Sequence, residues 1–302
     1  MGWVYYILWV VGREDNDMKI AVVTDSGSNI YHQNVEMEGL YKVPLQIIDQ
    51  DKVYLEGETI TIDQTYRMIY DGKLLKTSLP PLGRIDELFE QLKEEGYDLI
   101  FGVPITSGLS STISAMVTTA DRVGIPFDYF DCFATASNQL HLATSARILF
   151  DKGYDVEEVK RRLEVSMLDS VTFVIPNDLK HLARGGRITP MAATLAGFMS
   201  IKPILKVSID TGGKNDAYSK VRTMSKAWDV VIDYFKEKKV DENCLICVAH
   251  VWDPEKGQQF YERVKSNFPT AEIFQTDLIS TVGVHTGLGC TAIQYIRKVN
   301  LE

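Results

Sequence analysis

Residues 98–120 read DLIFGVPITSGLSSTISAMVTTA, and this stretch contains the repeating unit of the fold. The apolar run Asp98–Ile105 is typical of a buried strand, whereas the apolar residues from Ile113 to Ala120 recur with the spacing of one helix face. The polar segment Thr106–Thr112 joins the two. A buried strand, a short loop and an amphipathic helix in this order predict an α/β unit.

The same alternation continues on both sides of this stretch. Ile20–Thr24 and Tyr41–Ile48 are predicted strands that precede it, and Val156–Leu168 is a predicted helix that follows it. A second series begins at Val171 and includes the apolar strand Cys244–His250. Strands that alternate with helices favour an α/β protein with two α/β domains, whose sheets are largely parallel or mixed.

The restart of the pattern sets the predicted domain boundaries. We expect an N-terminal α/β domain at residues 18–170 and a C-terminal α/β domain at residues 171–302, because 302 residues suffice for two ordinary domains. Residues 1–17 form a predicted N-terminal extension. Its apolar run is too short to span a bilayer and has no basic start like that of a signal peptide. Any membrane contact is therefore expected to be transient.

Charge and cysteine content narrow the classes of function. The net charge of −9 argues against nucleic acid as the main partner. Cys244 and Cys247 form a C-x-x-C, but residues three apart on a strand point to opposite faces, so we predict no metal site there. Four cysteines in a chain of this length suit a reducing cytoplasm, which is the predicted location.

Four polar segments are predicted at strand ends, which is where open α/β sheets bind ligands. In the first, Thr24–Ser26, the side chain of Ser26 either lines a cleft or serves a local turn or helix cap. In the second, Lys76–Pro80, the hydroxyls of Thr77 and Ser78 precede a proline, which keeps the backbone extended. Extended hydroxyls can donate to a ligand oxygen, although a plain loop explains the same pattern.

The third segment is the loop within the opening stretch. Ser107 and Gly108 lie where backbone N–H groups and the positive end of a helix dipole converge, which suits a carboxylate or a phosphate. Capping of that helix by Ser110 or Ser111 is the alternative interpretation, and both can hold together.

The fourth segment, His285–Cys290, contains a histidine and two glycines that permit close backbone approach. The imidazole of His285 can donate to an anion, while a purely structural histidine is the alternative. Separately, Arg184 and Arg187 flank a Gly-Gly turn, and such a pair can serve as a phosphate fork or a partner patch. A solvated helix end explains the two arginines equally well.

In this order, the motifs resemble the DegV family. The resemblance covers about Met18 to Lys298, which is nearly the whole chain. No single motif is very specific, but seven motifs in the same order are. They are MKIAVVTDS at 18–26, KTSLP at 76–80, TSGLSST at 106–112, the segment 178–188 that ends in GGRI, KPIL at 202–205, KVR at 220–222 and HTGLG at 285–289.

The resemblance implies a fatty acid in an apolar tunnel between two domains, with no other cofactor. Family members with a clear role are fatty-acid-binding subunits of a bacterial fatty acid kinase. They present the carboxylate to a separate kinase subunit, which makes an acyl-phosphate for phospholipid synthesis. By position, Thr77 and Ser107 would bond the carboxylate and His285 would support them, whereas Arg187 would face the kinase. Ser26, Ser78, Gly108 and Thr286 complete the predicted ligand site, and Arg184 completes the predicted partner site.

An acyl chain in such a tunnel gains roughly 0.8 kcal/mol for each buried methylene. Leu195 and Gly197–Ile201 are predicted to form part of the tunnel wall, because methionine and phenylalanine adapt to a flexible chain.

A serine-based lipid or acyl hydrolase or transferase is the alternative function. Ser107 would be its nucleophile, His285 its base and Asp25 its acid. No G-x-S-x-G elbow surrounds Ser107. We therefore predict a non-catalytic lipid carrier.

Overall fold

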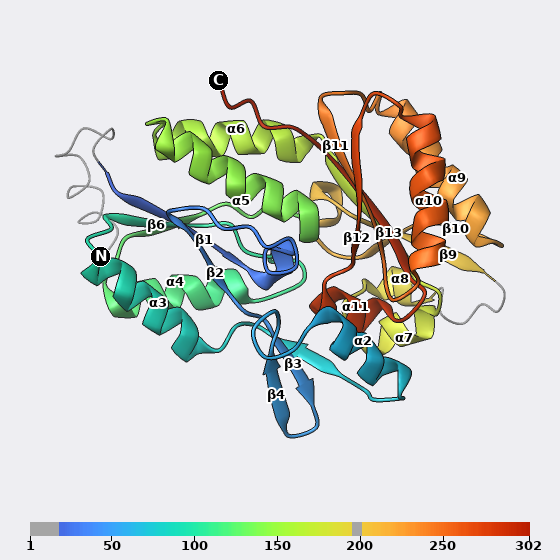
Figure 1. Ribbon diagram of the computed structural model, residues 1–302, viewed down its shortest axis with the longest axis horizontal. Helices are drawn as coiled ribbons and strands as arrows, with labels where there is room; N and C mark the ends of the chain where they lie inside the picture. The colour runs from blue at the N-terminus through green and yellow to red at the C-terminus, as the bar shows by residue number, and fades with distance from the viewer. Residues whose placement is uncertain (1–17, 195–200) are drawn as a thin grey trace.

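The computed structural model describes residues 18–194 and 201–302, and the described strands form three sheets flanked by helices (Figure 1). The first sheet is parallel, with the order β2-β1-β6-β7, as expected of strands joined by crossovers. Its strands are β1 (Ile20–Asp25), β2 (Leu40–Val43), β6 (Leu99–Gly102) and β7 (Phe127–Tyr129). We call residues 18–169, which contain this sheet, the N-terminal half.

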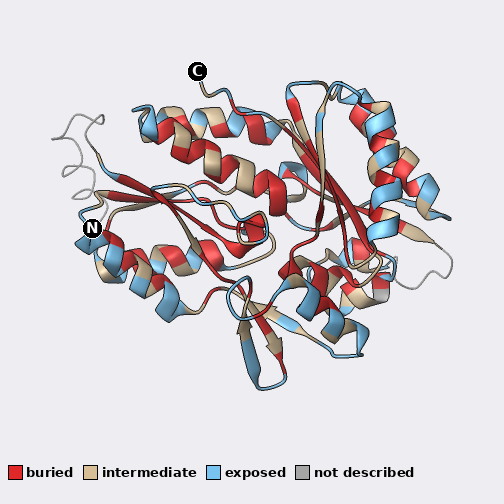
Figure 2. Ribbon diagram, viewed as in Figure 1, coloured by how far each residue is buried: buried red, intermediate tan, exposed pale blue. Residues whose placement is uncertain are grey.

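Helices cover both faces of the first sheet, so its central strand is apolar on both sides. Ala21 and Val23 pack against the helices of one face, whereas Val22 packs against those of the other. Figure 2 shows the buried residues concentrated along these strands and the inner helix faces. The helices are α3 (Leu82–Glu94) and α4 (Thr112–Val123) on the first face, and α5 (Ala136–Asp151) and α6 (Val156–Leu168) on the second.

The second sheet is mixed and belongs to the C-terminal half, residues 170–302. Its order is β10-β9-β8-β13-β11-β12, in which only β11 and β12 are parallel neighbours. The strands are β8 (Ser170–Ile175), β9 (Lys202–Val207), β10 (Asp216–Val221), β11 (Cys244–His250), β12 (Glu272–Asp277) and β13 (Thr291–Arg297). One face packs on α9 (Met224–Glu237) and α10 (Pro254–Asn267), and the opposite face is turned toward the N-terminal half.

A third, antiparallel sheet of the N-terminal half extends away from the first sheet and packs on the C-terminal half. Its order is β4-β3-β5, with β3 (Gln46–Asp49), β4 (Lys52–Leu55) and β5 (Lys76–Ser78), and α2 (Ile62–Tyr70) lies between β4 and β5 in the chain. Ile47 and Ile60 pack against Val284 of α11 (Ser280–Thr286), and the Tyr66 hydroxyl donates to the Leu278 carbonyl. The chain thereby carries β5 to the C-terminal half.

Two expectations from the sequence were wrong. The single strand expected at Tyr41–Ile48 is two strands in different sheets, because the chain leaves the first sheet at Pro44, which has no N–H to continue a ladder. The segment around His285 does not follow an apolar strand as a loop. His285 lies in the last turn of α11, between β12 and β13.

Four shorter elements complete the described structure. They are the 3-10 turns η2 (Ser26–Ser28) and η4 (Ile209–Thr211) and the helices α7 (Leu179–Arg184) and α8 (Pro190–Thr194).

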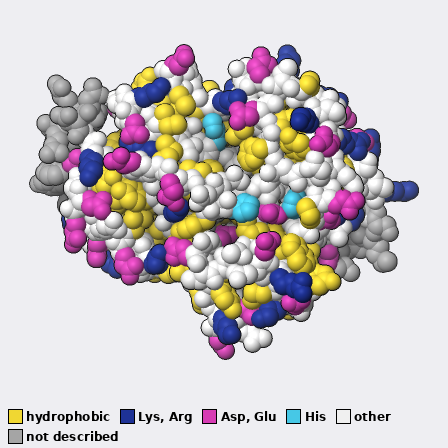
Figure 3. Space-filling view, in the orientation of Figure 1, with side chains coloured by type: hydrophobic (Ala, Val, Ile, Leu, Met, Phe, Trp, Pro, Cys, Tyr) yellow, Lys and Arg dark blue, Asp and Glu magenta, His cyan; other side chains and the backbone are white. Residues whose placement is uncertain are grey.

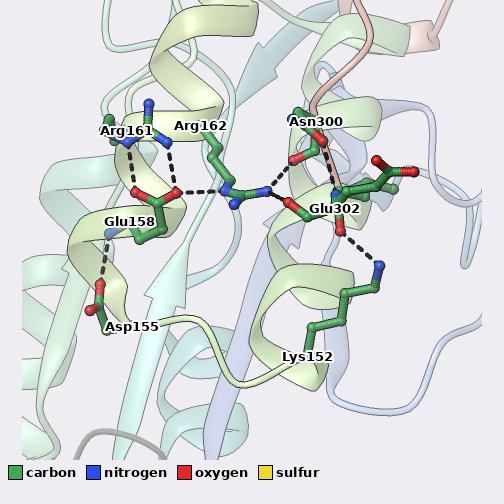
Figure 4. A network of polar contacts seen from close by, with 8 residues as sticks. Lys152, Asp155, Glu158, Arg161, Arg162, Asn300 and Glu302 are labelled. Atoms are coloured by element: carbon green, nitrogen blue, oxygen red, sulfur yellow. Dashed lines mark hydrogen bonds and ion pairs between the residues drawn. The ribbon is translucent and has the colours of Figure 1, made fainter.

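The C-terminal tail returns to the N-terminal half and is fixed there by a polar network (Figure 4). Arg162 of α6 donates to the carbonyl oxygens of Asn300 and Glu302, and its Nε bonds Glu158 at 2.7 Å. Lys152 donates to the carbonyl oxygen of Leu301 at 2.7 Å. Hydrogen bonds from Arg161, and to a lesser extent from Arg162, lower the pKa of Glu158 to about 2.

Acidic and basic side chains are intermixed on the face drawn in Figure 3, so this face has no large patch of one charge. Among the described helices, none combines the length and the apolar character that crossing a bilayer requires.

Candidate ligand-binding site

A pocket of about 320 Å³ lies where β5, the loop before α4 and α11 meet. Of the seven predicted ligand-binding residues, it gathers six from three distant parts of the chain. These six are Thr77, Ser78, Ser107, Gly108, His285 and Thr286.

Thr77 and His285, which are both half-buried, form the more enclosed side of this pocket. Thr77 is held by its pairing with Ile47 in the third sheet, so the K-T-S segment is a strand and not a plain loop. Its Oγ1 lies 2.7 Å from Nε2 of His285. Two elements that are far apart in sequence therefore present one hydrogen-bonded pair to the pocket.

The environment of His285 keeps its imidazole neutral. Burial, followed by the positive charges of Arg187 and His181, lowers its pKa to about 4. The other ring nitrogen, Nδ1, faces Gly185, where a Cβ atom would lie only 2.4 Å away. Glycine at the start of the Gly-Gly turn therefore lets α7 approach the imidazole closely.

The loop before α4 forms the exposed side of the pocket. The Ser107 hydroxyl donates to Oδ2 of Asp131 at 2.5 Å, and the Ser107 N–H points to the same oxygen at 3.3 Å. Ser111 is the N-cap residue of α4 but makes no side-chain capping bond, and Ser110 bonds Thr112 instead. The capping alternative is therefore wrong for both serines.

Gly108 allows this loop to touch the C-terminal half. A Cβ atom at Gly108 would lie 2.4 Å from the carbonyl oxygen of Gly212, in the turn that follows η4. Any larger residue would push the two halves apart at the edge of the pocket.

Ser26 lies outside the pocket. Its hydroxyl donates to Oε2 of Glu56 at 2.6 Å and accepts the Leu45 N–H at 2.9 Å. The Asp25 side chain accepts the Gly27 N–H at the start of η2, as the turn-and-cap alternative expects.

Glu56 is a buried residue beneath the site that sequence reasoning missed. Its carboxylate accepts both the N–H and the hydroxyl of Thr281 at 2.9 Å, and Thr281 lies in the first turn of α11. Burial raises the pKa of Glu56 to about 6. Together with Ser26, it fixes the helix that carries His285 to the N-terminal half.

An enclosed apolar void lies next to the pocket, and Leu109, Asn215 and Val282 line both. Its floor is the face of the second sheet that is turned toward the N-terminal half, where Ala249 and Ala292 are neighbours on β11 and β13. The void measures about 20 Å³, which is room for about one water molecule. An acyl chain would have to widen it.

The predicted tunnel wall is only partly described. Leu195 and residues 197–200 lie outside the described residues, and Ile201 is half-buried just before β9.

The two arginines differ in their relation to the pocket. Arg184 is exposed at the end of α7. Arg187 is also exposed, but it lines the pocket and donates to the Gly185 carbonyl at 3.0 Å. Arg187 therefore lies beside the ligand-binding segments, and its predicted contact with a partner stays a prediction.

The geometry does not assemble a serine triad. His285 contacts Thr77, whereas Ser107 contacts Asp131. Asp25 accepts from Gln139 and from backbone N–H groups, not from a histidine.

No group of histidine, cysteine and acidic side chains within the described residues could hold a metal ion. Cys244 packs in the core beneath α9 and α10, whereas Cys247 lines the void on the opposite face of the same sheet.

Comparison with known proteins agrees with this fold and these motifs. A DegV domain-containing protein of Streptococcus pneumoniae is 29% identical over 283 residues, which are 92% of this chain and 99% of that protein. The crystal structure of a fatty-acid-binding DegV family protein from Streptococcus agalactiae matches with a TM-score of 0.84 and 28% identity, over 93% of this chain and 99% of that one. The structure of DegV, a fatty-acid-binding protein from Bacillus subtilis, matches with a TM-score of 0.81 and 26% identity, over 93% and 100%.

The family model described as "Uncharacterised protein, DegV family" matches residues 19–298. This match spans both large sheets and every segment that lines the pocket. The chain belongs to the DegV family.

Proposed function

We propose that this protein binds one long-chain fatty acid and presents its carboxylate to a separate kinase subunit without performing catalysis itself. The observation that carries the proposal is the convergence of Thr77, His285 and the Ser107 loop on one pocket that adjoins an apolar void. A polar pocket beside an enclosed apolar space suits a molecule with one anionic end and a long hydrocarbon tail. The fatty-acid-binding relatives of the same fold support this choice of ligand.

The Thr77–His285 pair can supply a directed donor to the carboxylate. When Nε2 of the neutral imidazole carries the proton, it donates to Thr77 Oγ1 and leaves the threonine hydroxyl proton for a ligand oxygen. A carboxylate buried without such donors costs several kcal/mol. The positive end of α4 adds to this pair. The N–H groups of Ser107, Gly108 and Leu109 do not, because each is bonded within the protein.

The hydrocarbon tail would lie on the face of the second sheet that carries Ala249 and Ala292. These small side chains are 5% and 2% exposed. They project little from the sheet and so leave space between the two halves. Each methylene that enters contributes roughly 0.8 kcal/mol, so a long chain can offset the cost of widening the void.

The exposure of Ser107 and Arg187 at the pocket supports presentation to a kinase, because a head group bound there would be reachable from outside. Arg187 lines the pocket and is exposed, so it can contact both the ligand and a docked partner. Arg184 lies exposed at the end of the helix that packs beside His285.

Mass spectrometry of the purified protein tests lipid binding. We expect native spectra to show one fatty acid per chain, and extraction with solvent to release it for identification. Spectra of bare polypeptide alone, before and after incubation with palmitate, would rule out the proposed ligand.

A reconstituted kinase assay tests presentation. Arg187→Ala should retain palmitate but slow formation of the acyl-phosphate by the cognate kinase subunit. Arg67→Ala is the matched control, because Arg67 is an exposed arginine of α2 that does not line the pocket. Equal rates for wild type and Arg187→Ala would refute the assigned role of this arginine, and turnover without any kinase would refute the non-catalytic role.

A further inference from the structure

The two sides of the pocket use their hydroxyl groups differently. The Thr77 hydroxyl faces a neutral imidazole, whereas the Ser107 hydroxyl faces the carboxylate of Asp131 at 2.5 Å. Asp131 makes no ion pair with any cation among residues 18–194 and 201–302 that would cancel its charge. An acidic group therefore lies within one hydrogen bond of a site that is suited to an anion.

The position of Asp131 is fixed by its own loop. Its Oδ1 accepts the Phe133 N–H at 3.2 Å, and Phe133 adopts a positive φ of 46° that non-glycine residues rarely adopt. The Ala134 carbonyl then accepts the Thr106 N–H at 3.2 Å, which ties this loop to the Ser107 loop. The carboxylate is thus held against Ser107 by the backbone on both sides.

A serine hydroxyl has one proton to donate, and an ionised carboxylate can only accept. While Ser107 donates to Asp131, it has no proton left for a ligand carboxylate. If Ser107 turns to the ligand instead, Asp131 loses its strongest bond and two like charges face each other across one serine. A neutral head group on the same hydrocarbon chain meets neither cost.

We propose that Asp131, which contacts the pocket through Ser107 and does not line it, determines head-group specificity: its carboxylate competes with the carboxylate of the ligand for the Ser107 hydroxyl. The inference rests on the proposed fatty-acid binding and adds a prediction about head-group charge. Asp131 weakens the binding of the anionic acid relative to the neutral alcohol of equal chain length.

The test compares two probes, palmitate and cetyl alcohol, on delipidated full-length protein. Asp131→Asn retains the turn that accepts the Phe133 N–H but removes the charge. Repulsion between the carboxylates of Asp131 and palmitate should make the dissociation constant of wild type about tenfold higher than that of Asp131→Asn. This factor should shrink at high salt. Binding of cetyl alcohol should change by no more than about twofold.

Two further variants distinguish competition from a general loss of charge. Asp121→Asn removes an exposed carboxylate near the far end of α4 and should leave the affinity for both probes unchanged. Ser107→Ala should weaken palmitate binding more in the Asp131→Asn background than in wild type, because only there is the hydroxyl free for the ligand.

The outcomes separate this inference from the proposed function. Tighter palmitate binding by Asp131→Asn with unchanged cetyl alcohol binding supports it. Unchanged or weaker palmitate binding overturns it, as does an equal change for both probes, even if the wild type binds palmitate well. Wild-type protein that takes up neither probe overturns the proposed function and, with it, the inference.

Discussion

The two walls of the pocket are built on different physical principles. The wall with Thr77 and His285 consists of a strand and a helix, these two side chains are half-buried, and the histidine is neutral. The wall with Ser107 is an exposed loop whose hydroxyl is already bonded to a carboxylate. A donor that is fixed before the ligand arrives costs little to use, whereas an engaged donor must first lose its partner. The same residue types therefore contribute unequally to the binding of one anion.

The largest effect is expected from the neutrality of His285. Its pKa is about 4 in the folded protein against 6.5 for the free side chain, so the unfolded chain binds the extra proton between these values. The folded state should lose up to about 3 kcal/mol of stability as the pH falls from 6.5 to 4. Urea unfolding at several pH values measures this loss.

His285→Asn does not titrate in this range and should remove that part of the acid sensitivity. Asp25 and Glu56 titrate in the same range in both proteins, so the difference between the two pH profiles isolates the histidine. Parallel stability profiles of wild type and His285→Asn would mean that His285 is charged in the folded protein. The wall with Thr77 and His285 would then carry a charge, as the wall with Ser107 and Asp131 does.

Removal of the fixed donor should give the next largest effect. Thr77→Ala leaves a carboxylate oxygen without its bond, at a cost of about 1–3 kcal/mol, or a tenfold to hundredfold loss of affinity for palmitate. Thr77→Ser retains the hydroxyl and should recover most of the affinity. Equilibrium binding to delipidated protein is the measurement, and wild-type affinity in Thr77→Ala would place the head group elsewhere.

The fixed wall depends on a contact that the sequence did not reveal. Glu56 holds α11 through Thr281, and the two residues are 225 positions apart in the chain. Asp131 meets Ser107 across 24 positions, without a spacing that marks either residue. Local patterns predict which residues can donate a hydrogen bond, but the partner of each donor depends on which distant segments the fold brings beside it.

The fold shows the same division between local and long-range effects. The bounds of α6 and β11 agree with the predicted helix Val156–Leu168 and strand Cys244–His250, because α6 has the apolar spacing of a helix face and β11 is a continuous apolar run. The short helix α11 and the central strand β13 were not predicted. β13 lies between β8 and β11 through antiparallel pairing on both sides, which no spacing in residues 291–297 could indicate.

Convergence of the site was predicted for a different reason. Thr77, Ser107 and His285 were placed together by the order of their motifs, which resembles that of a known family, and the structure gathers them in one pocket. Ser26 belongs to an equally clear motif, yet its hydroxyl is turned to Glu56. Motif order predicts the neighbourhood, and only packing decides which hydroxyl reaches the ligand.

A smaller effect is expected from Glu56, with the opposite sign to that of His285. Burial raises its pKa to about 6 from 4.5, so the folded state holds its proton more tightly than the unfolded chain. Its contribution to stability is full below pH 4.5 and is lost, by about 2 kcal/mol, as the pH rises through 6. Glu56→Gln should remove this decline in urea unfolding profiles. A variant whose stability falls with pH as steeply as that of wild type would show that another group titrates.

The smallest effect is expected from Ser107, and it bears directly on the contrast between the two walls. Its hydroxyl proton is donated to Asp131, so Ser107→Ala removes a donor that the ligand hardly uses and should weaken palmitate binding by less than about fivefold, or 1 kcal/mol. The double variant Thr77→Ala/Ser107→Ala should differ from the sum of the single losses, because both groups address one anion. Ligand-free thermal stability should change little in Ser107→Ala, since an exposed serine loses only a surface bond. If Ser107→Ala instead loses as much affinity as Thr77→Ala, the serine must turn from Asp131 to the ligand at little cost, and the two walls act as one clamp.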